Sequence, residues 1–385
     1  MKNLIIAAVL LMPAAAGAQQ NIKFGNLEIN PFVSTQESYD SNIYLEKKLA
    51  KSASINRSSI GVNLVEKLGS RYDLMGGYSM EILGYSRATT INNAVHHNAN
   101  LSASAQLPKS ITVTVDDSYK QTTDQATSEL TTRAKRVENT AGLEVESPLR
   151  GKFGFTVALQ HVYNNYLESS YNVLDREETL VGADLSYKLQ PKTKLFFSYR
   201  YGNLNYRTSD NGDAISNNMD LGITGNIAPK VVGTVKAGVQ MRHYAKDLAT
   251  AKNTLTTGGY SAQAVWKPLE KTDVILFAKR ANVESSYLDS RFYTSTLTDI
   301  TVTRQVKKIK AGVGISYEGV QYPEKNVSTN AKRLDKNTNV RLTAEYNIQK
   351  WLKADLGYTY KDRTSNEKGW EYKDNIVALG LKAMF

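Results

Sequence analysis

The stretch that decides the fold is NIVALGLKAMF, residues 375–385, at the end of a 385-residue chain. Val377, Leu379, Leu381, Ala383 and Phe385 share one parity, and no charged tail follows them. A period of two is typical of a β-strand with one apolar face. The chain as a whole is polar, with a mean hydropathy of −0.41. A strand with one fully apolar face at the end of such a polar chain therefore predicts that this face contacts the hydrocarbon of a membrane.

The same alternation recurs along the chain, most clearly in residues 231–242, 309–318, 340–348 and 352–361. Each apolar stripe runs for about ten residues, the length that a tilted strand needs to cross a bilayer. The opposite parity carries Gly, Ser and charged residues. The chain has 23 Tyr and 9 Phe, with only 8 Pro, a composition that favours strands over helices. Beyond the first residues, no apolar run is long enough for a transmembrane helix.

Two classes of connection alternate between these stripes, as in outer-membrane barrels, where short turns lie on one side and long loops on the other. The short turns are residues 68–70, 108–110, 148–151, 190–193, 228–230, 268–271, 306–307 and 348–350. The long polar links are residues 40–54, 85–92, 121–133, 168–177, 207–214, 246–253, 284–291, 322–336 and 363–371.

Counting these connections predicts an all-β, transmembrane, antiparallel up-and-down outer-membrane β-barrel of about 18 strands, with 16–18 as the range. The weakest strand patterns are residues 27–39 and 292–305. A bilayer leaves no partner for an open sheet edge, so the last strand must pair with the first. An even strand number places both ends on the short-turn, periplasmic side. The sequence thus assigns residues 375–385 to the closing strand.

The N-terminus has the pattern of a secretory signal peptide: a short basic start, the apolar residues 4–12, and a small-residue cleavage site at Ala16 and Ala18. We expect residues 1–18 to be removed and residues 19–385 to form one outer-membrane barrel domain. The chain contains no cysteine, so this exported protein does not depend on disulfides. The predicted location is the outer membrane of a Gram-negative-type envelope.

The stretch PFVSTQESYDSNI, residues 31–43, resembles the N-terminal signature of the putative beta-barrel porin 2 family, in which a strand precedes Tyr-Asp-x-Asn and a hydrophobic residue. Residues 139–143 and 189–195 are similar to the family as well. The resemblance covers nearly the whole mature chain. It implies an outer-membrane barrel, often associated with exopolysaccharide production and export, and it supplies no catalytic residues. It also implies that Val377, Leu379, Leu381 and Phe385 form the signal read by the barrel assembly machinery.

The polar parity of the strands supplies the candidate lumen-lining residues. Acids predominate on the strands before residue 190 and bases on those after it, which predicts a transverse electric field across the lumen. The alternative is that these charges pair locally across neighbouring strands and keep the lumen wet. The candidates are Asp116, Glu144, Asp184, Arg200, Lys236, Arg242, Lys308, Lys310, Arg341, Lys353 and Lys382.

Other chemistry finds little support in the sequence. His96 and His97 are adjacent and point to opposite faces of a strand, so they do not form a metal site easily. Residues 209–213, SDNGD, fit a turn better than a calcium loop, because the bidentate Glu of an EF-hand is missing. We expect no catalytic residues, no cofactor, no metal and no nucleic-acid partner. The three tryptophans, Trp266, Trp351 and Trp370, are expected near the membrane interfaces. Loop tyrosines such as Tyr44 either pack within their loops, which we expect, or stack on sugars.

Two functions remain open. The first is a passive channel or export conduit for polar solutes or polysaccharide, because 16–18 strands leave an aqueous lumen. The second is a structural or adhesive barrel that acts through its outer loops. An energised transporter is not expected, since those barrels use about 22 strands and a plug. Expected partners are outer-membrane lipid and lipopolysaccharide, the barrel assembly machinery, and polysaccharide or export-complex proteins.

Overall fold

The computed structural model describes residues 22–148, 151–208, 212–246, 253–286, 290–325 and 330–385. The predicted signal peptide, with Ala16 and Ala18, lies outside these residues. The strands are β1 Ile22–Phe24, β2 Leu27–Asp40, β3 Ala53–Leu68, β4 Tyr72–Tyr85, β5 Ala94–Leu107, β6 Ile111–Thr122, β7 Arg136–Pro148, β8 Phe153–Tyr166, β9 Arg176–Gln190, β10 Thr193–Tyr206, β11 Ala214–Ala228, β12 Val231–Tyr244, β13 Thr254–Trp266, β14 Thr272–Glu284, β15 Phe292–Val306, β16 Ile309–Lys325, β17 Lys332–Asn347, β18 Leu352–Ser365 and β19 Tyr372–Met384. The short helical segments are α2 Thr89–Asn92, η1 Pro108–Ser110 and η2 Ser169–Leu174.

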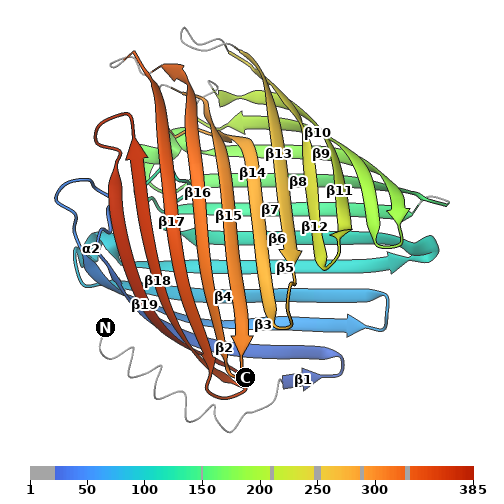
Figure 1. Ribbon diagram of the computed structural model, residues 1–385, viewed down its shortest axis with the longest axis horizontal. Helices are drawn as coiled ribbons and strands as arrows, with labels where there is room; N and C mark the ends of the chain where they lie inside the picture. The colour runs from blue at the N-terminus through green and yellow to red at the C-terminus, as the bar shows by residue number, and fades with distance from the viewer. Residues whose placement is uncertain (1–21, 149–150, 209–211, 247–252, 287–289, 326–329) are drawn as a thin grey trace.

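The strands β2 to β19 form one closed antiparallel barrel of 18 strands within the described residues. Each strand pairs with its neighbours in sequence, and β19 closes the ring against β2. Figure 1 shows the later, yellow-to-red strands crossing in front of the earlier, blue-to-green ones. β1 is a short addition that pairs only with the start of β2. The predicted fold and strand number are confirmed, including the two weak patterns, which become β2 and β15. Among the described residues, no helix has the length and apolar character to cross a membrane.

Alternation explains which face of the sheet points outward. Leu379 is 60% exposed and its cross-strand partner Leu356 is 53% exposed. Side chains paired directly across strands share a face, so the apolar stripes line up around the barrel into one exposed belt. A belt of this size on the surface is stable only against lipid.

The two ends of the barrel differ as predicted. At one end the turns are tight, and Lys109, Lys230, Lys271 and Lys307 adopt positive φ angles there. The C-terminus lies at this end, where the Phe385 N–H donates to the Pro31 carbonyl at 3.0 Å. At the other end the long loops pack on the strand ends in small apolar clusters, one of which joins Ile43 of the β2–β3 loop to Ile55 on β3 and to Leu83 and Tyr85 on β4. The well-buried apolar side chains of the described residues therefore gather mostly at the loop end, and these residues form no apolar core in the middle of the barrel.

Candidate lumen and outer mouth

The face opposite the apolar belt carries the charged residues that the parity predicts, and most of them form ion pairs. The guanidinium of Arg200 on β10 donates to both carboxylate oxygens of Asp184 on β9, at 2.5 and 2.9 Å. Gly182 makes this geometry possible: a Cβ at that position would lie 2.0 Å from Cδ of Arg200. The glycine on the charged face thus provides the space in which the Arg200 side chain lies against the wall.

Other inner-face pairs follow the same pattern and join strands close to one another. Lys236 lies 2.8 Å from Asp220, Arg341 lies 2.5 Å from Asp299, and Lys353 lies 3.2 Å from Glu345. Arg242 pairs with Glu284 near the outer end. Each base is thus compensated close to its own position on the wall. This geometry favours local pairing over an uncompensated basic half of the lumen.

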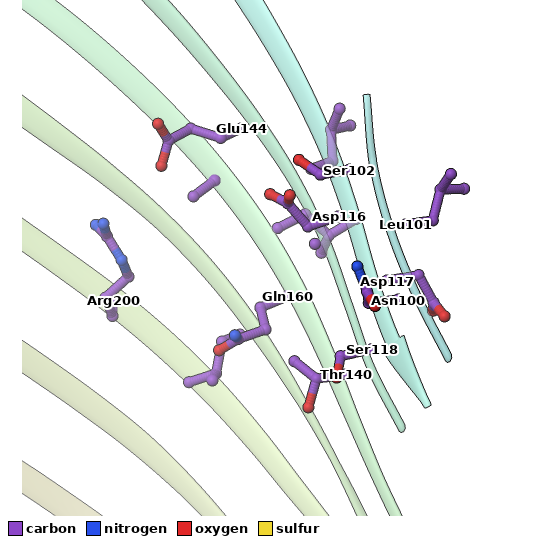
Figure 2. Close-up of a pocket in the computed structure, with 15 residues that line it drawn as sticks. Asn100, Leu101, Ser102, Asp116, Asp117, Ser118, Thr140, Glu144, Gln160 and Arg200 are labelled. Carbon is purple, nitrogen blue, oxygen red and sulfur yellow. The ribbon is translucent and has the colours of Figure 1, made fainter. Parts of the chain in front are cut away.

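Two predicted acids remain without an ion pair among the described residues: Asp116 on β6 and Glu144 on β7. Both line a cavity of about 550 Å³, together with Ser102, Gln160 and Arg200. Figure 2 shows the side chains of Asp116, Glu144 and Arg200 projecting from the strands into this space. Carboxylates beside amide and hydroxyl groups make a wall that hydrates well and attracts cations.

Three predicted lumen-lining bases, Lys308, Lys310 and Lys382, form no ion pair among the described residues. Lys308 was assigned to a strand, and this is wrong: it lies in the tight turn between β15 and β16, because the ladder ends at Val306 and Ile309. Its Nζ donates to the Ile348 carbonyl at 3.3 Å, so it lies on the rim at the short-turn end. Lys310 lies directly across from Glu345 in the ladder between β16 and β17, without an ion pair between them. Nζ of Lys382 lies 4.7 Å from the centre of the Phe32 ring.

The loop of residues 123–135, between β6 and β7, reaches across the outer mouth of the barrel. Its Glu129 is 3% exposed. The Glu129 carboxylate accepts hydrogen bonds from Ser285 Oγ at 2.7 Å, from the Ser286 N–H at 2.5 Å and from Ser286 Oγ at 2.8 Å. Ser285 and Ser286 directly follow β14, about half the ring away from β6 and β7. The sequence predicts a long loop between β6 and β7 but does not indicate that this loop crosses the mouth of the barrel.

The base of the same loop is held on its own side of the barrel. Asp124 lies 3.1 Å from Arg57 on β3, which also pairs with Glu81. Burial is the largest single effect on Asp124 and raises its pKa, but the charge and hydrogen bond of Arg57, together with the nearby His96 and Lys120, outweigh it, so the pKa is lower than usual. Burial and the neighbouring Arg57 lower the pKa of Arg133 to about 10, so it stays protonated at neutral pH. Its guanidinium lies 4.5 Å from the centre of the Tyr85 ring.

The histidines and tryptophans take up structural positions. His96 is buried and contacts Glu81 and Thr123, whereas His97 points to the other face and contacts Tyr78. The opposite orientation of this pair is confirmed. Trp351 stacks on Phe385 at the short-turn end, with ring centres 6.1 Å apart. Trp370 instead lies in the outer mouth, 3.7 Å from the guanidinium of Arg333. Residues 209–211 of the SDNGD turn lie outside the described residues.

The predicted assembly residues lie on the outward parity of β19. Val377 is 48% exposed, and Leu381 is partly exposed. They are therefore placed where lipid or another membrane protein can contact them. Their recognition by the assembly machinery stays a prediction.

The family profile described as "Putative beta-barrel porin 2" matches residues 15–385, and this match confirms the resemblance seen in the sequence. The structure of OccK1 (OpdK) from Pseudomonas aeruginosa is 7% identical, with a TM-score of 0.51 over 93% of this chain and 99% of that one. Another structure of OpdK from that organism is 7% identical and gives 0.50 over the same shares. OccAB4 from Acinetobacter baumannii, 10% identical, gives 0.49 over 95% and 99%. Such low identities show the barrel fold alone. No curated protein matches the chain in sequence.

Proposed function

Because the chain belongs to the putative beta-barrel porin 2 family, a family of outer-membrane barrels with a channel or transport role, we propose that it is a passive channel for small polar solutes. The family resemblance further suggests saccharides as the solutes. Nothing in the proposed mechanism requires an energy source or a cofactor. The protein would select solutes by size and by the charge of the wall.

One observation carries this proposal: the inner wall is polar, and part of it is left uncompensated. Asp116, Glu144, Ser102 and Gln160 line a cavity on that wall. A barrel of 18 strands is wide enough for an aqueous lumen. Ion pairs such as that of Arg200 with Asp184 make the wall more polar and add no net charge to it. Such a surface supports the passage of hydrated molecules and disfavours apolar ones.

A second function has its own supporting observation. The loop of residues 123–135 crosses the outer mouth and is fixed on the far side through Glu129. If that loop seals the barrel, the protein would act as a scaffold or adhesin through its outer loops. Lipopolysaccharide around the belt and the assembly machinery at β19 are partners that we propose for either function.

Single-channel recording in planar bilayers separates the two functions. The protein would be compared with a variant in which residues 126–132 are replaced by a short Gly-Ser linker, and folding would be checked by heat-modifiable gel mobility. A channel gives discrete conductance steps, and the shortened variant gives larger ones. If both folded proteins are silent, the channel is rejected and the scaffold is supported.

A further inference from the structure

A second cavity, of about 600 Å³, lies in the outer mouth, apart from the one on the wall. It is formed by parts of the chain that are far apart in sequence: the β2–β3 loop (residues 41–52), the β18–β19 loop (residues 366–371) with Arg363 and Tyr372 from the flanking strands, and Thr131 of the mouth loop. Closure of β19 on β2 brings the first two together. Lys47 pairs with Glu371 at 2.7 Å, and Asn42 donates to the Lys373 carbonyl at 2.9 Å.

The lining combines aromatic and basic side chains. Tyr44, Trp370 and Tyr372 contribute the rings, and Arg363, Lys47, Lys48 and Lys368 contribute the positive charges. The acidic lining residue is Glu46. Lys47 is paired with Glu371, but Lys48 and Lys368 form no ion pair among the described residues. The cavity is therefore strongly basic and has flat apolar surfaces.

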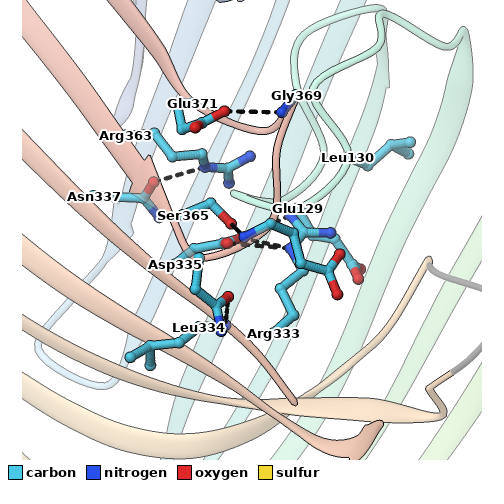
Figure 3. Close-up of polar contacts among 12 residues, drawn as sticks. Glu129, Leu130, Arg333, Leu334, Asp335, Asn337, Arg363, Ser365, Gly369 and Glu371 are labelled. Atoms are coloured by element: carbon cyan, nitrogen blue, oxygen red, sulfur yellow. Dashed lines mark hydrogen bonds and ion pairs between the residues drawn. The ribbon is translucent and has the colours of Figure 1, made fainter. Parts of the chain in front are cut away.

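Arg363 gives the decisive observation. Its side chain is 1% exposed, and it extends from β18 toward the β18–β19 loop and the mouth loop (Figure 3). Nε donates to Asn337 at 2.9 Å, and the guanidinium lies 5.4 Å from the Tyr372 ring centre. Nη1 and Nη2, however, have no hydrogen-bond acceptor in the described structure.

A buried guanidinium with two unused donors is costly, because each lost hydrogen bond of a charged group leaves an uncompensated desolvation penalty. The two Nη atoms form a planar fork that fits a carboxylate in a bidentate manner. The partly exposed ring of Tyr44 offers a surface on which the apolar face of a sugar ring can stack, whereas Trp370 already contacts Arg333 and Tyr372 is largely buried. The site thus matches a ligand that carries an anionic group on a ring.

We propose that this outer-mouth cavity binds acidic saccharides, with Arg363 holding the carboxylate, Lys368 and Lys48 adding long-range attraction, and Tyr44 contacting the sugar ring. This inference rests on the proposed function, which it deepens by naming a solute class. A site at the entrance raises the local concentration of its ligand and steers it toward the lumen.

The test is calorimetric titration of the folded protein in detergent with trigalacturonate, maltotriose and benzoate. We expect trigalacturonate to bind, with an affinity that falls as salt rises, and maltotriose to bind at least tenfold more weakly. Arg363→Gln should weaken binding of trigalacturonate about tenfold or more, the loss expected for a charged hydrogen bond. Lys368→Gln should weaken it about two- to fivefold, the loss expected for an exposed charge, and should reduce its salt dependence. Lys67→Gln, a change at the opposite, periplasmic end of the barrel, is the matched control and should have no effect.

Equal binding of the acidic and neutral saccharides would overturn the proposal, and so would unchanged binding in both variants. Benzoate binding as tight as that of trigalacturonate would overturn the assignment to saccharides. Because Lys368 is in an exposed loop, its variant remains informative if Arg363→Gln fails to fold. Binding in detergent does not require conduction, so this test and the bilayer recordings can fail independently.

Discussion

At the scale of single residues, the last side chain of the chain has a specific structural role. Phe385 stacks on Trp351 from the β17–β18 turn, and its N–H reaches Pro31 at the start of β2. It thus links the closing strand to both of its neighbours. The sequence indicates the apolar parity of this strand, but not the stacking partner, because a turn residue carries no periodic signal.

We expect deletion of Phe385, or Phe385→Asp, to reduce the amount of assembled barrel in the outer membrane. The direct energetic effect of a charge near the interface is small, about 0–1 kcal/mol, so a large loss of assembly would indicate recognition. Fractionation and heat-modifiable mobility measure it. Trp351→Ala is the control that removes the same stacking and keeps the C-terminal residue. Equal losses in both variants would reduce the role of Phe385 to packing.

At the scale of elements, the mouth loop of residues 123–135 shows where sequence reasoning stops. The strands are predictable because each repeats one simple pattern, and turn types follow from their short polar residues. The loop has no period, and its course across the mouth is fixed at the far side by one carboxylate, that of Glu129, which contacts two serines about half the ring away. Such long-range contacts of single side chains leave no pattern in one sequence.

We predict that Glu129→Gln increases the open-channel conductance, or its fluctuation, more than Asp124→Asn does. Glu129 is buried and accepts three hydrogen bonds, whereas the half-exposed pair of Asp124 and Arg57 contributes about 0–1 kcal/mol. Single-channel recordings give the ranking. Glu37→Gln, on the outward face opposite Leu379, should leave conductance unchanged. The reverse order of the two variants would contradict the prediction that the contacts of Glu129 with Ser285 and Ser286 hold the mouth loop in place.

The same recordings have a pH dependence with a defined sign. The pKa of Asp124 is lowered in the folded protein, so its contribution is fully present above the ordinary value of about 3.9 and is lost as pH falls through the lowered value. Conductance should therefore stay constant from neutral pH to about pH 5, near which an unperturbed carboxylate is still mostly ionised. In Asp124→Asn, any acid-induced rise that depends on this pair should be absent.

At the scale of the whole molecule, the sequence predicts the closed barrel, the strand number and the two faces of each strand. It does not predict which charges neutralise one another, since that depends on cross-strand distances. Arg341 and Lys236 prove to be ion-paired, and Lys308 lies on the rim. The predicted acids that have no ion pair among the described residues, Asp116 and Glu144, lie on one wall and should therefore dominate the field in that part of the lumen.

The last prediction follows from the negative charge that Asp116 and Glu144 leave on one wall of the lumen. The double variant Asp116→Asn with Glu144→Gln should shift the reversal potential toward anion selectivity, whereas Lys308→Glu should shift it little. Lys310→Glu should shift it toward cations, because this side chain has no ion pair among the described residues and lies on the inner parity. The effects should be clearest at low salt, since the Debye length is about 10 Å at 0.1 M and about 30 Å at 0.01 M. Glu37→Gln, a carboxylate lost from the outward face, is the control. If the double variant shifts the potential no more than this control, Asp116 and Glu144 do not line the conducting path, and the solutes must pass along another part of the wall.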